Sequence, residues 1–168
     1  DYETYNCSYK DVVKAYKELE QEGKMTVKVN EQCQLPSIDI LKDYTHHNYH
    51  QISTKYFKSG PLKLLGDGSL GARTAYVLGG YQDDKDSKGI CCFTQEQLDQ
   101  LINYANQHQM GCAIHCIGDG MMHMVVDSYK KYIDKANSNR NGIVHCQITD
   151  QNILDDFKEM QLLAYIQP

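Results

Sequence analysis

The sequence predicts an α/β fold in which short apolar strands alternate with amphipathic helices around a parallel sheet. Short runs of apolar residues recur along the chain, segments of helical periodicity separate them, and polar or glycine-containing turns join the two. This alternation favours a parallel sheet, because parallel neighbours need a long crossover connection that is usually a helix.

The first elements are a helix and a β-branched strand. Residues 9–22 place apolar side chains on one face, Ser8 is a suitable N-cap, and Gly23 is a suitable end. The β-branched run over residues 25–30 predicts a strand that ends in a polar turn. A short helix is expected over residues 37–43.

The middle of the chain is predicted to contain a strand, a long connection and a second long helix. Residues 61–66 form the apolar strand, and residues 67–93 are rich in glycine and aspartate, as in an ordered surface loop. Thr94 begins the helix with a Thr-x-x-Gln capping box to Gln97, and Gly111 marks the end before the next strand.

The remaining elements continue the alternation. Asp119 is the expected N-cap of a helix, and the turn NSNRNG separates that helix from the following strand. The predicted strands cover residues 112–116, 143–146 and 162–167, and the predicted helices cover residues 119–136 and 149–160.

Composition suits one globular domain, or part of a larger one. The 168 residues are 41% hydrophobic and 23% charged. The net charge of −5 is spread over interspersed acids and bases, so we expect no nucleic-acid partner. No apolar run approaches the ~20 residues that span a bilayer, so we expect no membrane segment.

The cysteines and the chain ends suggest a cytoplasmic fragment. Seven cysteines make an odd number without a CxxC pair, which is ordinary for reduced thiols in the cytoplasm. The sequence begins without Met and without a signal peptide, and it stops inside a strand-like run. Both ends are therefore expected to be cut from a longer chain.

Lys63, His115 and His145 each lie where a predicted strand runs into a loop. The carboxyl ends of parallel strands meet at one edge, so these side chains are expected to converge, and such a set suggests a metal site. The alternatives are a solvated lysine and two hydrogen-bonded core histidines. Asp67 and Asp119 follow glycines, so turn and N-cap roles come first for them.

An open doubly wound sheet that binds a nucleotide is the competing architecture. Such a sheet usually carries a phosphate-binding glycine fingerprint after its first strand. GDGSLG (66–71) matches neither GxGxxG nor the GxxxxGK[ST] loop, so nucleotide binding is not favoured.

Four segments in order resemble the amidohydrolase superfamily, with amidohydrolase family 3, which includes N-substituted formamide deformylases, as the closest branch. They are KLLGDGSLGARTA (63–75), AIHCIGDG (113–120), Arg140 with IVHCQ (143–147), and YIQP (165–168). The resemblance covers roughly residues 20–168.

The resemblance implies a partial (β/α)8 barrel of the TIM type with one or two divalent metals, usually zinc. Lys63 then matches the lysine of the fourth barrel strand, which can be carboxylated. His115 and His145 match the histidines of the fifth and sixth strands. Together these three residues are the predicted catalytic and metal-binding set, and residues 1–168 would be a single segment holding about strands 3 to 7.

The chain also departs from the family pattern. It contains no HxH pair, since HHNYH (46–50) is the only close histidine cluster, and no strand follows YIQP to carry the family's catalytic aspartate. Val144 stands where the family often has an acidic residue. The isolated segment is therefore expected to hold half of the metal site and to be inactive.

The predicted function is hydrolysis of an amide, formamide or cyclic amide by metal-activated water in the intact enzyme, acting on a small-molecule substrate. The alternative is a non-catalytic segment for binding or assembly, whose open strand edges would favour self-association into homo-oligomers.

Other residues receive structural expectations. The glycines of the 66–71 turn are expected to need positive φ. Arg73 is expected to pair with a neighbouring acid rather than with substrate, and four further histidines are expected at the surface: His46, His47, His50 and His123.

Overall fold

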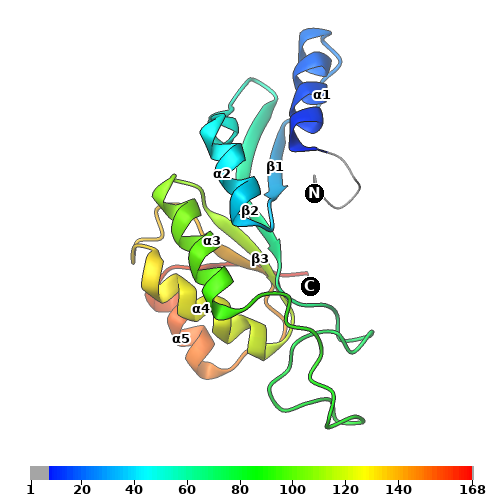
Figure 1. Cartoon of the computed structure of the whole chain (residues 1–168), viewed down its shortest axis with the longest axis vertical. Coiled ribbons are helices and arrows are strands. Elements are labelled where there is room, and N and C mark those ends of the chain that lie inside the picture. The colour runs from blue at the N-terminus through cyan, green and yellow to red at the C-terminus, as the bar shows by residue number, and fades with distance from the viewer. Residues whose placement is uncertain (1–7, 168) are drawn as a thin grey trace.

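Residues 8–167 are described by the computed structural model, and they build a five-stranded parallel sheet flanked by helices (Figure 1). The strands are β1 Val29–Gln34, β2 Phe57–Leu65, β3 Cys112–Cys116, β4 Gly142–His145 and β5 Leu163–Tyr165. The helices are α1 Tyr9–Gln21, α2 Ile38–His46, α3 Gln95–Gln107, α4 Asp119–Tyr132 and α5 Gln151–Glu159, with a 3₁₀ turn at Tyr49–Gln51.

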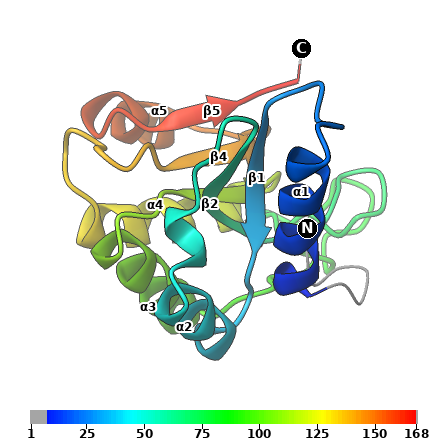
Figure 2. The same ribbon diagram turned by 90° about the horizontal axis from the view of Figure 1, so that it is seen from above.

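The strands lie side by side in chain order, β1 to β5, and every pair is parallel. A doubly wound sheet reverses its strand order at a switch point, whereas a barrel adds each strand next to the previous one. Figure 2 shows α2 to α5 gathered on one side of the sheet, as in the outer layer of a barrel. The predicted α/β fold, a partial TIM-type barrel, is confirmed.

The hydrophobic core lies between the sheet and these helices. Leu62 and Leu64 of β2 are fully buried there, as is Ile114 of β3. Successive side chains of a strand point to opposite faces. A residue that is next to one of these three in its own strand therefore points away from the helices. This alternation decides which strand residues reach the barrel's inner face.

Helix ends follow the predicted capping residues, with one correction. Ser8 caps α1, and Thr94 forms the full capping box with Gln97 at the start of α3. The N-cap of α4 is Gly118 rather than Asp119. Asp119 is the first residue of α4, and its Oδ1 instead accepts hydrogen bonds from the backbone N–H groups of Gly120 and Leu78.

Several predicted boundaries were wrong. β1 begins at Val29 rather than at residue 25, and Val27 is 63% exposed, so its β-branched character reflects no burial. Helix α2 extends to His46. Helix α4 ends at Tyr132 instead of residue 136, because the Asp134 carboxylate accepts hydrogen bonds from the N–H and hydroxyl of Ser138 and so stabilises a turn.

The long connection over residues 67–93 contains turns and no helix or strand, as predicted, and it extends away from the helices in Figure 1. The expectation of positive φ for Gly66, Gly68 and Gly71 was wrong, because none has it. Two of them are required by close approach: a Cβ on Gly66 would lie 2.7 Å from the His115 carbonyl oxygen, and one on Gly68 would lie 2.0 Å from Thr74 Oγ1.

In the part of the chain that the structure describes, no helix has both the length and the apolar character that crossing a bilayer requires.

Candidate metal centre

Lys63 points to the inner face of the sheet. It lies in β2 between Leu62 and Leu64, which face the helices, and only 7% of the residue is exposed. Burial lowers the pKa of its ammonium group below the usual value, because a charged amine loses hydration there. A lysine in this position is more easily neutral than one at the surface.

His115 shares that inner face. It follows Ile114 in β3 and precedes Cys116, and both of these are fully buried against the helices. Its Nε2 lies 3.0 Å from the carbonyl oxygen of Gly68 and 3.3 Å from Asp67 Oδ1. The hydrogen bond to Asp67, aided by the carbonyl and opposed by partial burial, raises the pKa of His115.

His145 reaches the same place by a different route. Strand alternation would turn it toward the helices, because Ile143, two residues earlier, is in the core. However, His145 has φ of 75° and Cys146 has φ of 48°, both in the left-handed region. Such backbone is uncommon for residues other than glycine and marks a functional or strained position. Here the left-handed backbone lies at the end of β4, which pairs with β3.

The two imidazole rings are brought together by these features. Their centroids lie 4.5 Å apart with 77° between the ring planes. Lys63 lies two residues before Leu65, the residue of β2 that pairs with His115, and therefore on the same face of the sheet as Leu65. The three predicted site residues therefore come from three neighbouring strands and lie at the carboxyl edge of the sheet.

Each histidine has one ring nitrogen committed and one available. His115 Nε2 faces two oxygen acceptors, which leaves Nδ1. His145 Nδ1 lies 2.6 Å from Gln167 Oε1, which leaves Nε2. Metal-binding histidines almost always donate their second N–H to an oxygen in this way.

The donor chemistry fits a divalent cation such as zinc as one part of a centre. Neutral imidazole nitrogens are preferred zinc ligands, and two are available here. Among residues 8–167, no group of three or more His, Cys, Asp or Glu side chains is arranged to hold a metal. The pair would therefore need Lys63 or ligands from elsewhere to complete a coordination shell.

Two contacts at this edge were not anticipated from the sequence. Asp67, expected to serve a turn, has a fully buried side chain that contacts His115. Gln167 holds His145, and nothing in the sequence pattern distinguishes it from other glutamines.

The remaining polar residues behave mostly as expected. Arg73 pairs with Asp83 in the long connection. His46 and His47 are exposed, whereas His50 and His123 are half-buried. His123 lies 2.8 Å from Asp150, the N-cap of α5.

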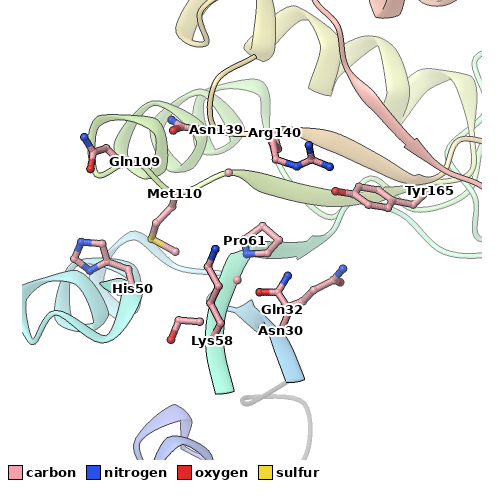
Figure 3. Close-up of a pocket in the computed structure, with 13 residues that line it drawn as sticks. Asn30, Gln32, His50, Lys58, Pro61, Gln109, Met110, Asn139, Arg140 and Tyr165 are labelled. Atoms are coloured by element: carbon pink, nitrogen blue, oxygen red, sulfur yellow. The ribbon is translucent and has the colours of Figure 1, made fainter. Parts of the chain in front are cut away.

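A separate cavity of about 320 Å³ lies beside the amino ends of β2, β3 and β4 (Figure 3). Lys58, Pro61 and Arg140 border it, and no acidic residue lines it. Neither Lys63 nor the two clustered histidines contribute to it. Chemistry in barrels occurs at the carboxyl edge, so this amino-end cavity is not the candidate centre.

Known proteins match the chain in sequence and in fold. The sequence model of the amidohydrolase family matches residues 1–168. YtcJ of Bacillus subtilis (strain 168), which bears the amidohydrolase name, is 31% identical over 118 residues. Protein LONG AFTER FAR-RED 3 of Arabidopsis thaliana is 28% identical over 120 residues. These matches cover 70% of the chain but only 22% and 20% of the two relatives.

Two solved structures share the fold. They are uncharacterized metal-dependent hydrolases from Pyrococcus furiosus and Pyrococcus horikoshii OT3, each with a TM-score of 0.78 and 24% sequence identity. The match covers 92% of this chain in both cases, and 31% and 30% of the two hydrolases. The chain thus corresponds to about a third of each hydrolase chain.

Proposed function

The chain belongs to the amidohydrolase family, and from this premise we propose that it supplies one side of the metal centre of an enzyme that hydrolyses carbon–nitrogen bonds. The observation that carries the proposal is the pair of imidazole rings, His115 and His145, 4.5 Å apart at the carboxyl edge. A left-handed backbone at His145 brings the pair together, which is costly unless it serves the site.

The histidines would hold the ion through Nδ1 of His115 and Nε2 of His145. A bound zinc ion would supply Lewis acidity and lower the pKa of a water molecule to about 7. Gly68 and Gln167 keep the two rings oriented through their oxygen atoms. The protein's part is to hold these donors in place before the metal arrives.

Lys63 would join the site as a carbamate. Its neutral amine nitrogen attacks carbon dioxide, a C–N bond forms, and the proton lost from nitrogen goes to solvent. The product is an anion with two oxygen donors. Burial supports this role, because few other arrangements satisfy a lysine that is 7% exposed on an inner face.

Substrates would be small amides, N-substituted formamides or cyclic amides. The test is a hydrolysis assay on the full-length gene product, reconstituted with zinc, against members of these three classes and against matched esters. Turnover of at least one amide class that is lost in the His115→Ala/His145→Ala variant supports the proposal. Turnover of esters alone would refute the carbon–nitrogen assignment.

The carbamate has its own test. In ¹³C-bicarbonate, the wild-type protein is expected to show a carbamate carbon resonance that Lys63→Met abolishes and that Lys58→Met, at an exposed lysine of the same strand, leaves unchanged. A signal that survives Lys63→Met would assign the carbamate to another amine.

A second candidate role is assembly. Within residues 8–167, β5 is an edge strand whose far side pairs with no other described strand. Unpaired edges favour pairing with another chain, which would make the segment self-associate. Light scattering on the purified 168-residue chain tests this role. A concentration-dependent dimer or larger species would support it, and a monomer would contradict it.

We propose a cytoplasmic location for the same protein. Five cysteines are free thiols, which supports a reducing compartment: Cys91, Cys92, Cys112, Cys116 and Cys146.

A further inference from the structure

Asp67 is the most completely enclosed carboxylate at the carboxyl edge. It follows Gly66 at the end of β2, and its side chain is 0% exposed. Its oxygens accept hydrogen bonds from three backbone N–H groups: Tyr76 at 3.0 Å, Ile117 at 3.0 Å and Gly118 at 2.8 Å. Because Ile117 and Gly118 precede α4 and Tyr76 lies in the long connection, one side chain ties three segments together.

The same carboxylate contacts a predicted metal ligand. Asp67 Oδ1 lies 3.3 Å from His115 Nε2, and the Gly68 carbonyl oxygen lies 3.0 Å from the same nitrogen. Both groups are acceptors, so Nε2 carries a hydrogen. In the neutral imidazole, Nδ1 is then the nitrogen with a free lone pair. The contacts thus select one of the two tautomers.

We propose that Asp67 is a positioning residue that holds His115 in the Nε2–H form and so directs Nδ1 toward the metal. The three backbone hydrogen bonds fix the carboxylate, and the carboxylate fixes the ring. Through Tyr76, the same residue makes the geometry of the site depend on the order of the 67–93 connection. This inference rests on the proposed metal-dependent function, but it concerns the imidazole before any metal is bound.

Asp119 provides a matched control a few residues away. Its Oδ1 also accepts from two backbone N–H groups, those of Leu78 and Gly120, and it also links the connection to α4. It has no contact with His115 among the interactions described. Substitution of Asp119 should therefore loosen the 67–93 connection, as substitution of Asp67 would, but without removing a contact to the His115 imidazole.

The test compares tautomers in ¹⁵N-histidine-labelled chain without metal, at a pH high enough that His115, whose pKa is raised by Asp67, is neutral. Two-bond ¹H–¹⁵N correlations distinguish Nε2–H from Nδ1–H, and His115→Gln assigns the ring. The wild-type chain and Asp119→Asn are expected to show His115 as Nε2–H. Asp67→Asn is expected to show a mixture of both tautomers. Zinc titration is expected to give an affinity roughly 10–100-fold weaker for Asp67→Asn, with Asp119→Asn unchanged.

The outcomes separate the inference from the function on which it rests. An Nδ1–H ring in the wild-type chain overturns the inference, even if the Asp67→Asn variant fails to fold. Equal tautomer changes in Asp67→Asn and Asp119→Asn also overturn it, because general loosening would then suffice. If the tautomers behave as expected but wild-type chain and full-length protein bind no zinc, the positioning role stands and the metal-dependent function fails.

Discussion

Both the carboxyl edge and the amino edge of the sheet are rich in polar side chains, but the side chains of the two edges are arranged differently. At the carboxyl edge, the rings of His115 and His145 are held 4.5 Å apart, each through a contact at one ring nitrogen, and Lys63 is buried in the neighbouring strand β2. At the amino edge, Asn106, Asn137 and Asn141 use their amides to bond one another and the backbone. Saturated hydrogen bonding stabilises a fold, whereas chemistry requires groups that are held but not saturated.

Backbone geometry shows the same contrast. Left-handed residues at the amino edge, Asn137 and Arg140, lie in the turn before β4, where such conformations are ordinary. At the carboxyl edge, the left-handed pair His145 and Cys146 ends a strand and redirects a side chain. Substitutions at the two edges should therefore separate metal binding from stability.

The largest expected effect is on zinc binding by the His115→Ala/His145→Ala variant. Removing a residue that only supports a ligand weakens metal binding roughly 10–100-fold, so removing both imidazoles should weaken it by more than about 100-fold. The free energy of unfolding should change by no more than about 1 kcal/mol, because both rings lie at the edge of the core. Calorimetric zinc titration and urea unfolding measure the two quantities. A large loss of stability would contradict the contrast between a carboxyl edge that binds metal and an amino edge that stabilises the fold.

The opposite result is expected for Asn141→Ala at the amino edge. Asn141 is fully buried, and its Oδ1 accepts a 2.9 Å hydrogen bond from the N–H of Cys112. Truncation would leave buried polar groups without partners and should lower the free energy of unfolding by about 2–4 kcal/mol. Zinc affinity of the folded variant should be unchanged.

The control for this variant is Asn152→Ala at an exposed position of α5, which should change stability by less than about 0.5 kcal/mol. Weaker zinc binding in folded Asn141→Ala would mean that the amino edge also shapes the metal centre.

A smaller, pH-dependent effect is expected in the helical layer, which belongs to neither edge. Partial burial acts to raise the pKa of Asp99, but hydrogen bonds from Lys131, Ser128 and Gln95 outweigh it and hold the pKa below its usual value. The folded-state pKa is therefore lower than the unfolded one. The stabilisation is present above the unfolded value and disappears as pH falls through the folded value.

Asp99→Asn should accordingly lower the free energy of unfolding by about 1–2 kcal/mol at pH 7 and by much less at about pH 2.5. Urea denaturation at both pH values measures this difference, with the exposed Glu96→Gln of the same helix as the control. An equal loss at both pH values would show that the Asp99 charge is not what stabilises the layer.

Much of the fold could be predicted from the sequence, because its signals are local. The Thr94–Gln97 capping box and the alternation of Leu62 and Leu64 around Lys63 depend on neighbouring residues. β1 was misplaced because four of its six residues, Asn30, Glu31, Gln32 and Gln34, are polar, so a search for apolar runs does not find its bounds. The placement of Lys63 and His115 on neighbouring strands at one edge of the sheet followed from the rule that parallel strands end at the same edge.

The remaining features depend on contacts between distant segments. From the sequence, Asp67 was assigned only a turn role. Its hydrogen bonds to Ile117 and Gly118 could not be foreseen, because they join positions about fifty residues apart along the chain. The left-handed backbone at His145 has no signature in IVHCQ. An aspartate directly after an apolar strand, here in GDG (66–68), is the sequence signal that could have singled out Asp67.

The most direct test of the central claim, that the carboxyl edge is a metal centre, is zinc K-edge X-ray absorption on the zinc-loaded protein. We expect two imidazole nitrogens at about 2.0–2.1 Å in the wild-type and Asn141→Ala proteins, and no imidazole scattering in the His115→Ala/His145→Ala variant. A spectrum with the same imidazole scattering in all three proteins would place the zinc elsewhere and contradict the claim.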